Sequence, residues 1–598
     1  MSFERPMLSE EEVKVRREAL EKRFSPWKRQ TIGDWFDERV AEFSERELIF
    51  TLKKSYSYKE TQEIVDNLAK GLLKLGVKRR EHVAYIMANY PELLFLRFAL
   101  AKIGAVAVGI NFRAGLEELR YFLRHTDVAY LVTMDCFARL NYIDMLKELC
   151  PEISKTKVGE TIKSETFPLL RQVITFSPNG ESYLGTIDFY SLIKEGQEVP
   201  DERLAQVQAA SRYPDEVCEI LYTSATTGHP MAALLWHDGF LRTGYGHAYG
   251  RPNQDGRRIF VPIPLNHVFA YAEAMVAGMD VGGALILQPS FALPEAYELI
   301  EKGRAYDMVC VPTIMIALLS HPDREKYDLS RLKGVVVAAA PAPVPLWERV
   351  IRELGLVELS TGYGQTETHG GTCVSAPDAT IDTLAHRVGW VKPGGVAALS
   401  EFHGTFCEYK VIDPVTGKDI PQGAEGELAC RGATITRGYY NNPEANARTF
   451  DKDGWMHTGD LGVIHQDGYI ELTGRSKELY IRGGELIAPR EVENYISQHP
   501  KVNQVYIVGV PDARMGEVGI AYIELKPGEI CSKGEIVNFC KKGLARYKTP
   551  TYVEFISGTE FPLTATGKVQ KFKLRERAIK ELELEEVSAK YKVIRKVN

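Results

Sequence analysis

Hydrophobic positions near the start of the chain switch between helical and strand spacing. Apolar residues recur every three or four positions over residues 61–75, and Gly76 is placed to end that helix. Residues 83–88 form a continuous apolar run of strand length, followed by a helical pattern over 91–103 and a second apolar run over 105–110. A strand, a helix and a strand in this order predict a parallel sheet that is covered on both faces.

The same alternation returns further along the chain and predicts more parallel strands. The apolar runs lie at residues 220–224, 283–288, 307–312 and 334–341. The first two thirds of the chain are therefore expected to be α/β, built on doubly wound sheets. Because ligands of such sheets bind beyond the carboxyl ends of the strands, we expect the site in the loops after Ser224, Pro341 and Tyr363.

Two later segments have a different texture. From about Thr405, short apolar segments separated by frequent glycines and turn pairs predict a small β-barrel-like unit. After Gly474 the pattern predicts an α+β segment, with strands near 505–510 and 521–525 and a helix over 533–545.

The length of the chain, 598 residues, exceeds what one hydrophobic core usually supports. We therefore divide it into a large N-terminal domain of residues 1–476 and a small C-terminal domain of residues 477–598. The tail from Leu574 is mixed in charge and is expected to be a solvated helix.

Composition and charge exclude several classes of partner. A net charge of −6 and a pI near 6.2 provide no basic surface excess, so neither nucleic acid nor an anionic membrane is expected to bind. The nine cysteines show no CxxC pair, which predicts reduced thiols instead of a disulfide framework or a zinc site.

No segment of the sequence is typical of a membrane span or a signal peptide. The first residues are charged and lack an apolar core. The most apolar stretch, residues 268–287, is broken by Glu273 and Asp280 and predicts a buried helix that runs into a strand. We expect a cytoplasmic protein, and the sequence leaves its oligomeric state open.

The segment YTSATTGHPMA, residues 222–232, is typical of a phosphate-binding loop. Its small hydroxyl residues surround Gly228 and Pro230, so backbone N–H and side-chain O–H groups can point at an anion. Most such loops contain a lysine that supplies a point charge to the phosphates, but the corresponding position holds Met231.

Five segments in order carry a family resemblance over about residues 68–577. They are YTSATTGHPMA (222–232), STGYGQTETHGG (360–371), GWMHTGDLG (454–462), GYIELTGRSKELYIRGGELIAPREVE (468–493) and FPLTATGKVQK (561–571). With this order and spacing, the chain resembles the adenylate-forming superfamily, which contains acyl-CoA synthetases, firefly-luciferase-type enzymes and the adenylation domains of peptide synthetases. Its overall texture is most similar to AMP-forming acyl-CoA synthetases.

The resemblance implies a reaction and its cofactors. A carboxylate would attack the α-phosphate of ATP in the presence of Mg²⁺, pyrophosphate would leave, and the thiol of coenzyme A would then displace AMP from the acyl-adenylate. It also implies that the C-terminal domain is mobile and turns about Lys477 between the two steps. The direction of the reaction under physiological conditions stays open.

Site residues are carried over by matching each motif to this sequence. Lys568, Glu367 and Thr226 would be catalytic, with Glu367 also the magnesium ligand. The nucleotide would be bound by Thr223, Ser224, Thr227, Gly228, Ala339, Ala340, Pro341, Tyr363, Gly364, Thr366, Asp460 and Arg475. The acyl pocket would include His267, Val268, Tyr271 and Gly362, and the coenzyme A tunnel Gly483 and Gly484. Without the family resemblance, the sequence would predict that Asp460 is a turn residue bonded to its own backbone and that Lys568 is an exposed lysine.

The sequence departs from the family pattern at several of these positions. Ala225, Met231 and Ala232 stand where the phosphate loop usually has glycine, lysine and glycine, Ala339 stands at a common glycine, and Leu486 at a common asparagine. Alanine narrows the conformations of a loop, and methionine offers phosphate no charge. We hypothesise that Met231 raises the Michaelis constant for ATP or pyrophosphate more than it lowers turnover.

The acid itself is defined only by class. No acidic residue stands at Asn266 or His267, where relatives that activate amino acids carry an aspartate, and the neighbouring residues are apolar. A medium-chain, aryl or alicyclic monocarboxylate therefore fits. Two alternatives stay open: an adenylating enzyme that loads a separate carrier protein, and a catalytically inactive nucleotide-binding homologue.

Overall fold

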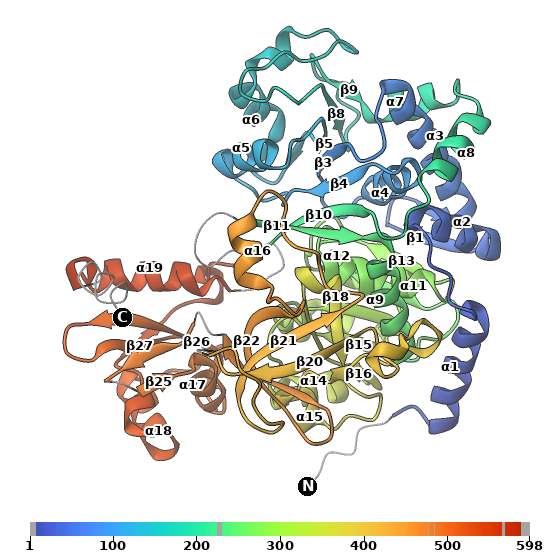
Figure 1. Cartoon of the computed structure of the whole chain (residues 1–598). Helices are drawn as coiled ribbons and strands as arrows, with labels where there is room; N and C mark the ends of the chain where they lie inside the picture. Colours follow the sequence, from blue (N-terminus) through green and yellow to red (C-terminus); the bar gives the residue numbers. More distant parts are fainter. Residues whose placement is uncertain are drawn as a thin grey trace.

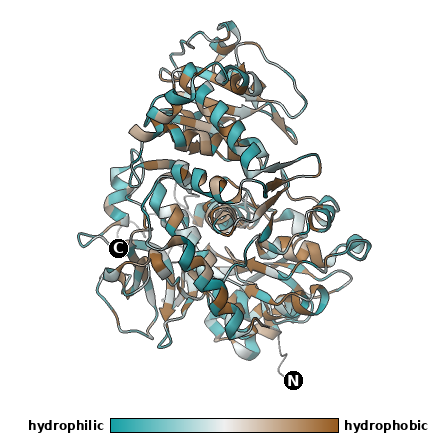
Figure 2. Ribbon diagram, turned by 90° about the vertical axis from the view of Figure 1, so that its right-hand side faces the viewer, coloured by the Kyte–Doolittle hydropathy of each residue, from teal (hydrophilic) through white to brown (hydrophobic). Residues whose placement is uncertain are grey.

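The structure is a computed structural model that describes residues 7–223, 230–414, 416–475, 478–483, 485–564 and 569–587. Two seven-stranded sheets form the large N-terminal part, a β-rich unit follows, and a smaller α+β lobe ends the chain (Figure 1). The predicted fold class is confirmed. Figure 2 shows hydrophobic colour mainly on the central strands and hydrophilic colour mainly on the outer helices, as expected for sheets covered on both faces.

The first large sheet has the strand order β11-β10-β4-β3-β5-β8-β9. All its pairs are parallel except β10 with β11. Its strands are β3 (His82–Ile86), β4 (Val106–Gly109), β5 (Tyr130–Met134), β8 (Gln172–Phe176), β9 (Ile187–Asp188), β10 (Val217–Thr223) and β11 (Met231–Trp236). Its helices are α3 (Tyr58–Leu75), α4 (Pro91–Ile103), α5 (Leu116–His125), α6 (Tyr142–Leu149), α7 (Phe189–Gly196) and α8 (Asp201–Ala210), and a short hairpin joins β6 (Cys136–Phe137) to β7 (Leu140–Asn141).

Helices α3 and α4 follow the sequence prediction closely. Helix α3 begins with a capping box between Ser57 and Glu60 and ends at Gly76, whose φ of 95° places it in the left-handed region that glycine adopts without strain. Every residue of α4 is buried, which explains why its apolar pattern has no polar face.

The second large sheet has the strand order β16-β15-β14-β12-β13-β1-β2, and only the edge pair β1 with β2 is antiparallel. Its strands are β1 (Glu47–Phe50), β2 (Ser55–Ser57), β12 (Arg258–Val261), β13 (Ala284–Leu287), β14 (Asp307–Cys310), β15 (Gly334–Val337) and β16 (Glu358–Ser360). The accompanying helices are α1 (Glu10–Phe24), α2 (Ile32–Phe43), α9 (His237–Gly250), α12 (Glu295–Lys302), α13 (Pro312–Ser320) and α14 (Val344–Leu354).

The most apolar stretch of the sequence is a buried, broken helix, as predicted. It consists of α10 (Val268–Ala270), the π-helical turn η2 (Tyr271–Val276) and α11 (Ala277–Met279), all of them buried, and it leads into β13. Among the helices of the described residues, none has both the length and the apolar character needed to cross a bilayer.

The β-rich unit contains two antiparallel sheets. A three-stranded sheet is formed by β17 (Gly362–Gln365), β18 (Gly370–Val374) and β19 (Trp390–Val391), and a four-stranded sheet by β20 (Cys407–Ile412), β21 (Gly426–Gly432), β22 (Met456–Ile464) and β23 (Ile470–Arg475). The short helices α15 (Ile381–His386) and α16 (Pro443–Thr449) lie in its connections.

The C-terminal lobe is built on the strand order β25-β24-β27-β26, with β28 parallel to β27. Its elements are β24 (Tyr480–Arg482), β25 (Glu485–Ile487), α17 (Pro489–Ile496), β26 (Val502–Asp512), β27 (Gly516–Leu525), α18 (Lys533–Gly543), β28 (Tyr552–Phe555) and α19 (Lys571–Glu581). The boundary predicted at residue 477 lies outside the described residues.

The expectation of a solvated tail helix is wrong. Leu574 and Ala578 of α19 are fully buried, and they pack with Val508 and Ile520 of the C-terminal sheet. Leu574 and Ala578 are four positions apart, so they form a stripe on one face of the helix, and the partly buried Ile579 packs against the same cluster. Burial of this stripe makes α19 a part of the lobe.

Candidate active site

Asp460 is the centre of a buried polar cluster between two sheets of the β-rich unit. It lies directly opposite Arg475 in the pairing of β22 with β23, and Arg475 Nε is 2.9 Å from Asp460 Oδ1. The other oxygen, Oδ2, accepts hydrogen bonds from the Tyr363 hydroxyl at 2.7 Å and from Gln365 Nε2 at 2.6 Å. Gln365 also donates to the carbonyl of Thr458 at 2.9 Å, which fixes the amide. The sequence-predicted residues Tyr363, Asp460 and Arg475 are therefore brought together.

The charges of this cluster are set by burial and by Asp460. Burial, followed by the charge of Asp460, raises the pKa of Tyr363 well above its usual value, so Tyr363 stays a hydrogen-bond donor. The charge of Asp460 raises the pKa of Arg475. Each carboxylate oxygen has two lone-pair positions, and Tyr363, Gln365 and Arg475 use three of these four, so Asp460 keeps capacity to accept one further hydroxyl group such as one of a ribose.

Glu367 lies in the short turn after β17, together with Thr366, and is 8% exposed. Its Oε1 accepts a hydrogen bond from the Tyr439 hydroxyl at 2.8 Å, and its own carbonyl accepts from the backbone N–H of Thr436. Burial raises the pKa of Glu367. A hard carboxylate held on one oxygen fits the ligand that Mg²⁺ prefers, because the second oxygen can still point at a cation.

The ends of the phosphate loop are held together by a β-pair. Thr223, the last residue of β10, lies opposite Met231, the first residue of β11. Thr223 Oγ1 is buried and has no hydrogen-bond partner among the described residues, which fits a hydroxyl that serves a phosphate. Met231 is half-buried and packs against the main core.

Several sequence-predicted residues lie outside the described part of the chain, and their roles stay predictions. They are Ser224, Ala225, Thr226, Thr227, Gly228, Lys477, Gly484 and Lys568.

The loop after β15 explains why glycine is common at one of its positions. Ala339 has a φ of 67°, in the left-handed region, where a Cβ atom costs about 1–2 kcal/mol. Ala339 and Pro341 are exposed and Ala340 is half-buried, so the loop is accessible to a ligand.

Two glycines of β17 are required by close packing against β18. A Cβ atom on Gly362 would lie 2.6 Å from the carbonyl oxygen of Cys373, and one on Gly364 would lie 1.9 Å from that of Gly370. Neither position therefore tolerates a side chain without a shift of the backbone, and the two glycines flank Tyr363 in the strand.

The predicted acyl-pocket residues His267, Val268 and Tyr271 occupy the start of the broken helix. His267 Nδ1 accepts from the backbone N–H of Phe269 at 3.3 Å and caps α10. Val268 and Tyr271 are each 2% exposed, and the Tyr271 ring packs edge-on against Phe240.

A cavity of about 260 Å³ adjoins the same stretch of chain. Its apolar lining comes from Phe112, Pro262, Ile263, Pro264, Pro289, Phe291, Ile314, Ala317 and Leu563, and its polar lining from Asn89, Arg113, Ser290, Thr313 and Thr564. Leu563 and Thr564 belong to the segment that leads to Lys568, so both the N-terminal and the C-terminal parts of the chain contribute walls. None of the four residues predicted for the acyl pocket is among its lining residues: His267, Val268, Tyr271 and Gly362.

Gly483, predicted to line a coenzyme A tunnel, lies in a tight turn of the C-terminal lobe. Its φ is 61°, and its N–H donates to the carbonyl of Met515 at 2.7 Å. This geometry explains the glycine by backbone conformation, and its role toward coenzyme A stays a prediction.

Sequence reasoning missed Gln365 and Tyr439. Gln365 stands inside the GYGQTET motif, between Gly364 and Thr366, which were both predicted to bind the nucleotide. Its position in the motif could therefore have identified its amide as a site residue. Tyr439 gave no such signal, because its contact with Glu367 joins residues 72 positions apart.

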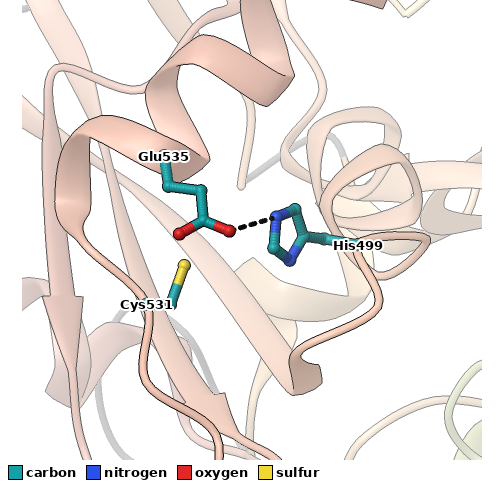
Figure 3. A group of neighbouring side chains, drawn as sticks. All are labelled: His499, Cys531 and Glu535. Carbon is teal, nitrogen blue, oxygen red and sulfur yellow. Dashed lines mark ion pairs between the residues drawn. The ribbon is translucent and has the colours of Figure 1, made fainter.

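A separate group of potential metal ligands lies in the C-terminal lobe (Figure 3). His499 Nε2 is 3.5 Å from Glu535 Oε1, and Cys531 Sγ lies within 4.8 Å of the ligand atoms of both. However, the ammonium of Lys501 is 3.0 Å from Glu535, and the Lys501 backbone N–H donates to His499 Nδ1 at 3.4 Å. Lys501 thus already supplies a positive charge beside the carboxylate of Glu535.

The family model described as AMP-binding enzyme matches residues 36–440, and the model of the AMP-binding enzyme C-terminal domain matches residues 491–568. The chain belongs to the AMP-binding enzyme family. This confirms the resemblance drawn from the five sequence segments, and the second match coincides with most of the C-terminal lobe.

Similar proteins within this family include acyl-CoA synthetases and ligases. The putative acyl-CoA synthetase YngI of Bacillus subtilis (strain 168) is 34% identical over 556 residues, covering 93% of this chain and 98% of that protein. The mitochondrial medium-chain acyl-CoA ligase ACSF2 of Danio rerio is 34% identical over 568 residues, covering 94% and 90%. The crystal structure of the anthranilate CoA ligase AuaEII in complex with anthranoyl-AMP is similar with a TM-score of 0.79 and 25% identity, covering 92% and 98%.

Proposed function

We propose that this AMP-binding enzyme activates a carboxylic acid with ATP and transfers the acyl group to coenzyme A, giving acyl-CoA, AMP and pyrophosphate. The observation that carries the proposal is the preformed cluster in which Tyr363, Gln365 and Arg475 fix the buried carboxylate of Asp460. Relatives named acyl-CoA synthetase and acyl-CoA ligase, which span nearly the whole chain, support this activity.

The nucleotide binds between this cluster and the phosphate loop. Asp460 accepts a hydrogen bond from a ribose hydroxyl, and Arg475 stays charged beside the α-phosphate. Tyr363 and the loop of Ala339, Ala340 and Pro341 flank the adenine. Glu367 is the residue that would hold Mg²⁺, which when bound neutralises charge on the phosphates.

The C-terminal domain supplies the catalytic charge. We assign this charge to Lys568, whose ammonium stabilises the negative charge that develops when the carboxylate attacks the α-phosphate. Leu563 and Thr564, just before Lys568, line the 260 Å³ cavity, so movement of this domain about Lys477 would change the cavity wall. Coenzyme A would then enter past Gly483 and Gly484.

The organic acid occupies the cavity beside Pro262, Ile263 and Pro264. Its lining is mainly apolar and has few polar groups, as is usual for a site that binds a small organic molecule. A medium-chain, aryl or alicyclic monocarboxylate fits this lining. The relatives named for a medium-chain acid and for anthranilate represent two of these classes.

We also propose a cytoplasmic location. All nine cysteines are free, and seven of them are buried. This is in keeping with a reducing compartment.

The test is mass spectrometry of the purified protein with Mg²⁺, ATP, coenzyme A and a panel of linear, aryl and alicyclic acids, with Lys568→Ala as the control. We expect AMP and acyl-CoA to rise together for one class of acid and to fall sharply in the control. AMP or acyl-adenylate without a thioester would redirect the proposal to a carrier-protein acceptor. Neither product with any acid would contradict the activity and favour a nucleotide-binding homologue without catalysis.

A further inference from the structure

Arg97, in the middle of the fully buried helix α4, makes three contacts that converge on the active site. Its guanidinium forms an ion pair with Glu219 of β10, in which Nε donates to Oε2 at 3.1 Å. Nη1 donates to the backbone carbonyl of Leu265 at 2.7 Å. The guanidinium carbon also lies 3.4 Å from the centre of the Tyr271 ring, a cation–π contact.

The partners of Arg97 belong to two different sides of the proposed site. Glu219 lies in the strand that ends at Thr223, immediately before the phosphate loop. Leu265 is two residues before His267, and Tyr271 opens the π-helical turn. Arg97 therefore touches both the strand that presents the phosphate loop and the segment that presents the acid.

A second side chain restrains the same segment from the cavity side. Asn89 Nδ2 donates to the carbonyl of Ile263 at 2.8 Å, and Asn89 Oδ1 accepts from the N–H of Leu265 at 2.7 Å. Asn89 also lines the cavity. Residues 263–265 are thus hydrogen-bonded to Asn89 and to Arg97, one just before α4 and the other within it.

The ion pair is fully buried, and both oxygens of its carboxylate accept hydrogen bonds. The side chains of Arg97 and Glu219 are 1% and 3% exposed, and the Tyr85 hydroxyl donates to the remaining oxygen of Glu219 at 2.6 Å. Well-packed apolar residues usually stabilise a core as well as a buried ion pair does, so stability alone is a weak reason for these charges. A guanidinium differs from an apolar side chain in that it can hold a carboxylate, a carbonyl and an aromatic face in one fixed geometry.

We propose that Arg97 is a positioning residue for the acid substrate, which sets the placement of residues 262–271 relative to the phosphate loop. This inference rests on the proposed function, in that the segment is taken to bind the acid. Loosening of the segment would misplace the carboxylate relative to the α-phosphate, and small misplacements of reacting groups cost large factors in rate.

The test compares Arg97→Lys with Arg257→Lys. Arg257 is a matched control because it is also fully buried and paired, with Asp307 at 2.8 Å and Glu358 at 2.7 Å. Arg257 immediately precedes β12, so it lies at the amino end of that strand, whereas ligands of such a sheet bind beyond the carboxyl ends. We expect Arg97→Lys to lower kcat/KM for the acid about tenfold, with kcat itself reduced, and to alter the preference among acids, whereas Arg257→Lys shifts the melting temperature and leaves kcat/KM within about twofold.

Hydrogen–deuterium exchange of the unliganded protein provides a readout that does not depend on activity. In Arg97→Lys, amide exchange should accelerate in residues 262–271 more than in the strands of the second sheet. If Arg97→Lys folds poorly, Arg97→Met combined with Glu219→Met leaves no unpaired charge, and the same local acceleration is expected. Amide exchange that accelerates equally throughout the protein would overturn the positioning role. So would wild-type exchange rates in residues 262–271 together with the wild-type preference among acids.

Failure of the proposed function can be told apart from failure of this inference. If the wild-type protein makes no acyl-CoA from any acid, the function is wrong, and the exchange experiment still decides whether Arg97 restrains residues 262–271. If the wild type is active and Arg97→Lys behaves like Arg257→Lys in both assays, the inference alone is wrong.

Discussion

The proposed ribose side and the proposed phosphate side of the candidate site differ in how many of their polar groups already have hydrogen-bond or ion-pair partners within the protein. On the ribose side, Asp460 is buried and its two oxygens are held by three side chains from two further strands. On the phosphate side, Thr223 Oγ1 has no partner among the described residues, and Met231 stands where a lysine is usual. In the proposed function, recognition of the nucleoside would therefore be preorganised, whereas binding of the phosphates would depend more on Mg²⁺ and on the C-terminal domain.

The largest expected effect comes from Asp460→Asn, which removes the carboxylate charge at the centre of the preorganised cluster. The amide cannot pair with Arg475 and is a weaker acceptor for ribose hydroxyls. We expect a loss of about 2 kcal/mol, roughly 30-fold in kcat/KM for ATP, because hydrogen bonds to charged groups contribute that much. Steady-state kinetics with varied ATP would measure it.

Asp467→Asn is the matched control for this change. Asp467 also pairs with an arginine, Arg387 at 2.6 Å, but it is exposed in the turn between β22 and β23. Its kinetics should match the wild type, since exposed ion pairs contribute little. Equal losses in the two variants would argue that Asp460 acts through the sheet and not through ATP.

A smaller effect is expected for Met231→Lys, which would strengthen binding of the phosphates. A lysine beside the end of β10 would add a charged donor for the phosphates, worth about 1 kcal/mol, and would lower the KM for ATP about fivefold with less change in kcat. The same titrations with pyrophosphate would follow the reverse reaction. Met231→Leu keeps the volume without the charge and should change neither constant. An unchanged KM in Met231→Lys would contradict the hypothesis that Met231 loosens the grip on phosphate.

The smallest effect is expected for Ala339→Gly, which relieves backbone strain in the loop after β15. Removal of the Cβ atom at a φ of 67° gains about 1 kcal/mol, and the greater freedom of glycine in the unfolded chain takes back about half. A net gain of about 0.5 kcal/mol should raise the midpoint of chemical denaturation slightly. Ala340→Gly, at a residue outside the left-handed region, should lower it instead. A lower midpoint in both variants would mean that the strain at Ala339 is offset by contacts of its methyl group.

Much of the fold and part of the site could be predicted because their signals are local. The helix over 61–75, its end at Gly76 and the strands at 83–88 and 105–110 depend on residues within a few positions of each other. The five sequence segments likewise pointed to Asp460 and Arg475, whose pairing across one hairpin follows from their order. The solvated tail was mispredicted because the residues that mark the buried face of α19, Leu574 and Ala578 with the partly buried Ile579, stand among many charged residues.

By itself, the sequence determined the α/β class, the family and three members of the Asp460 cluster, Tyr363, Asp460 and Arg475, since these depend on periodicity and on motifs read along the chain. Only the tertiary structure decided which side chains support them. Tyr439 reaches Glu367 across 72 positions, and Arg97 reaches Glu219 across 122. Such contacts are set by how sheets and helices pack, and packing brings together residues whose separation along the chain carries no periodic signal.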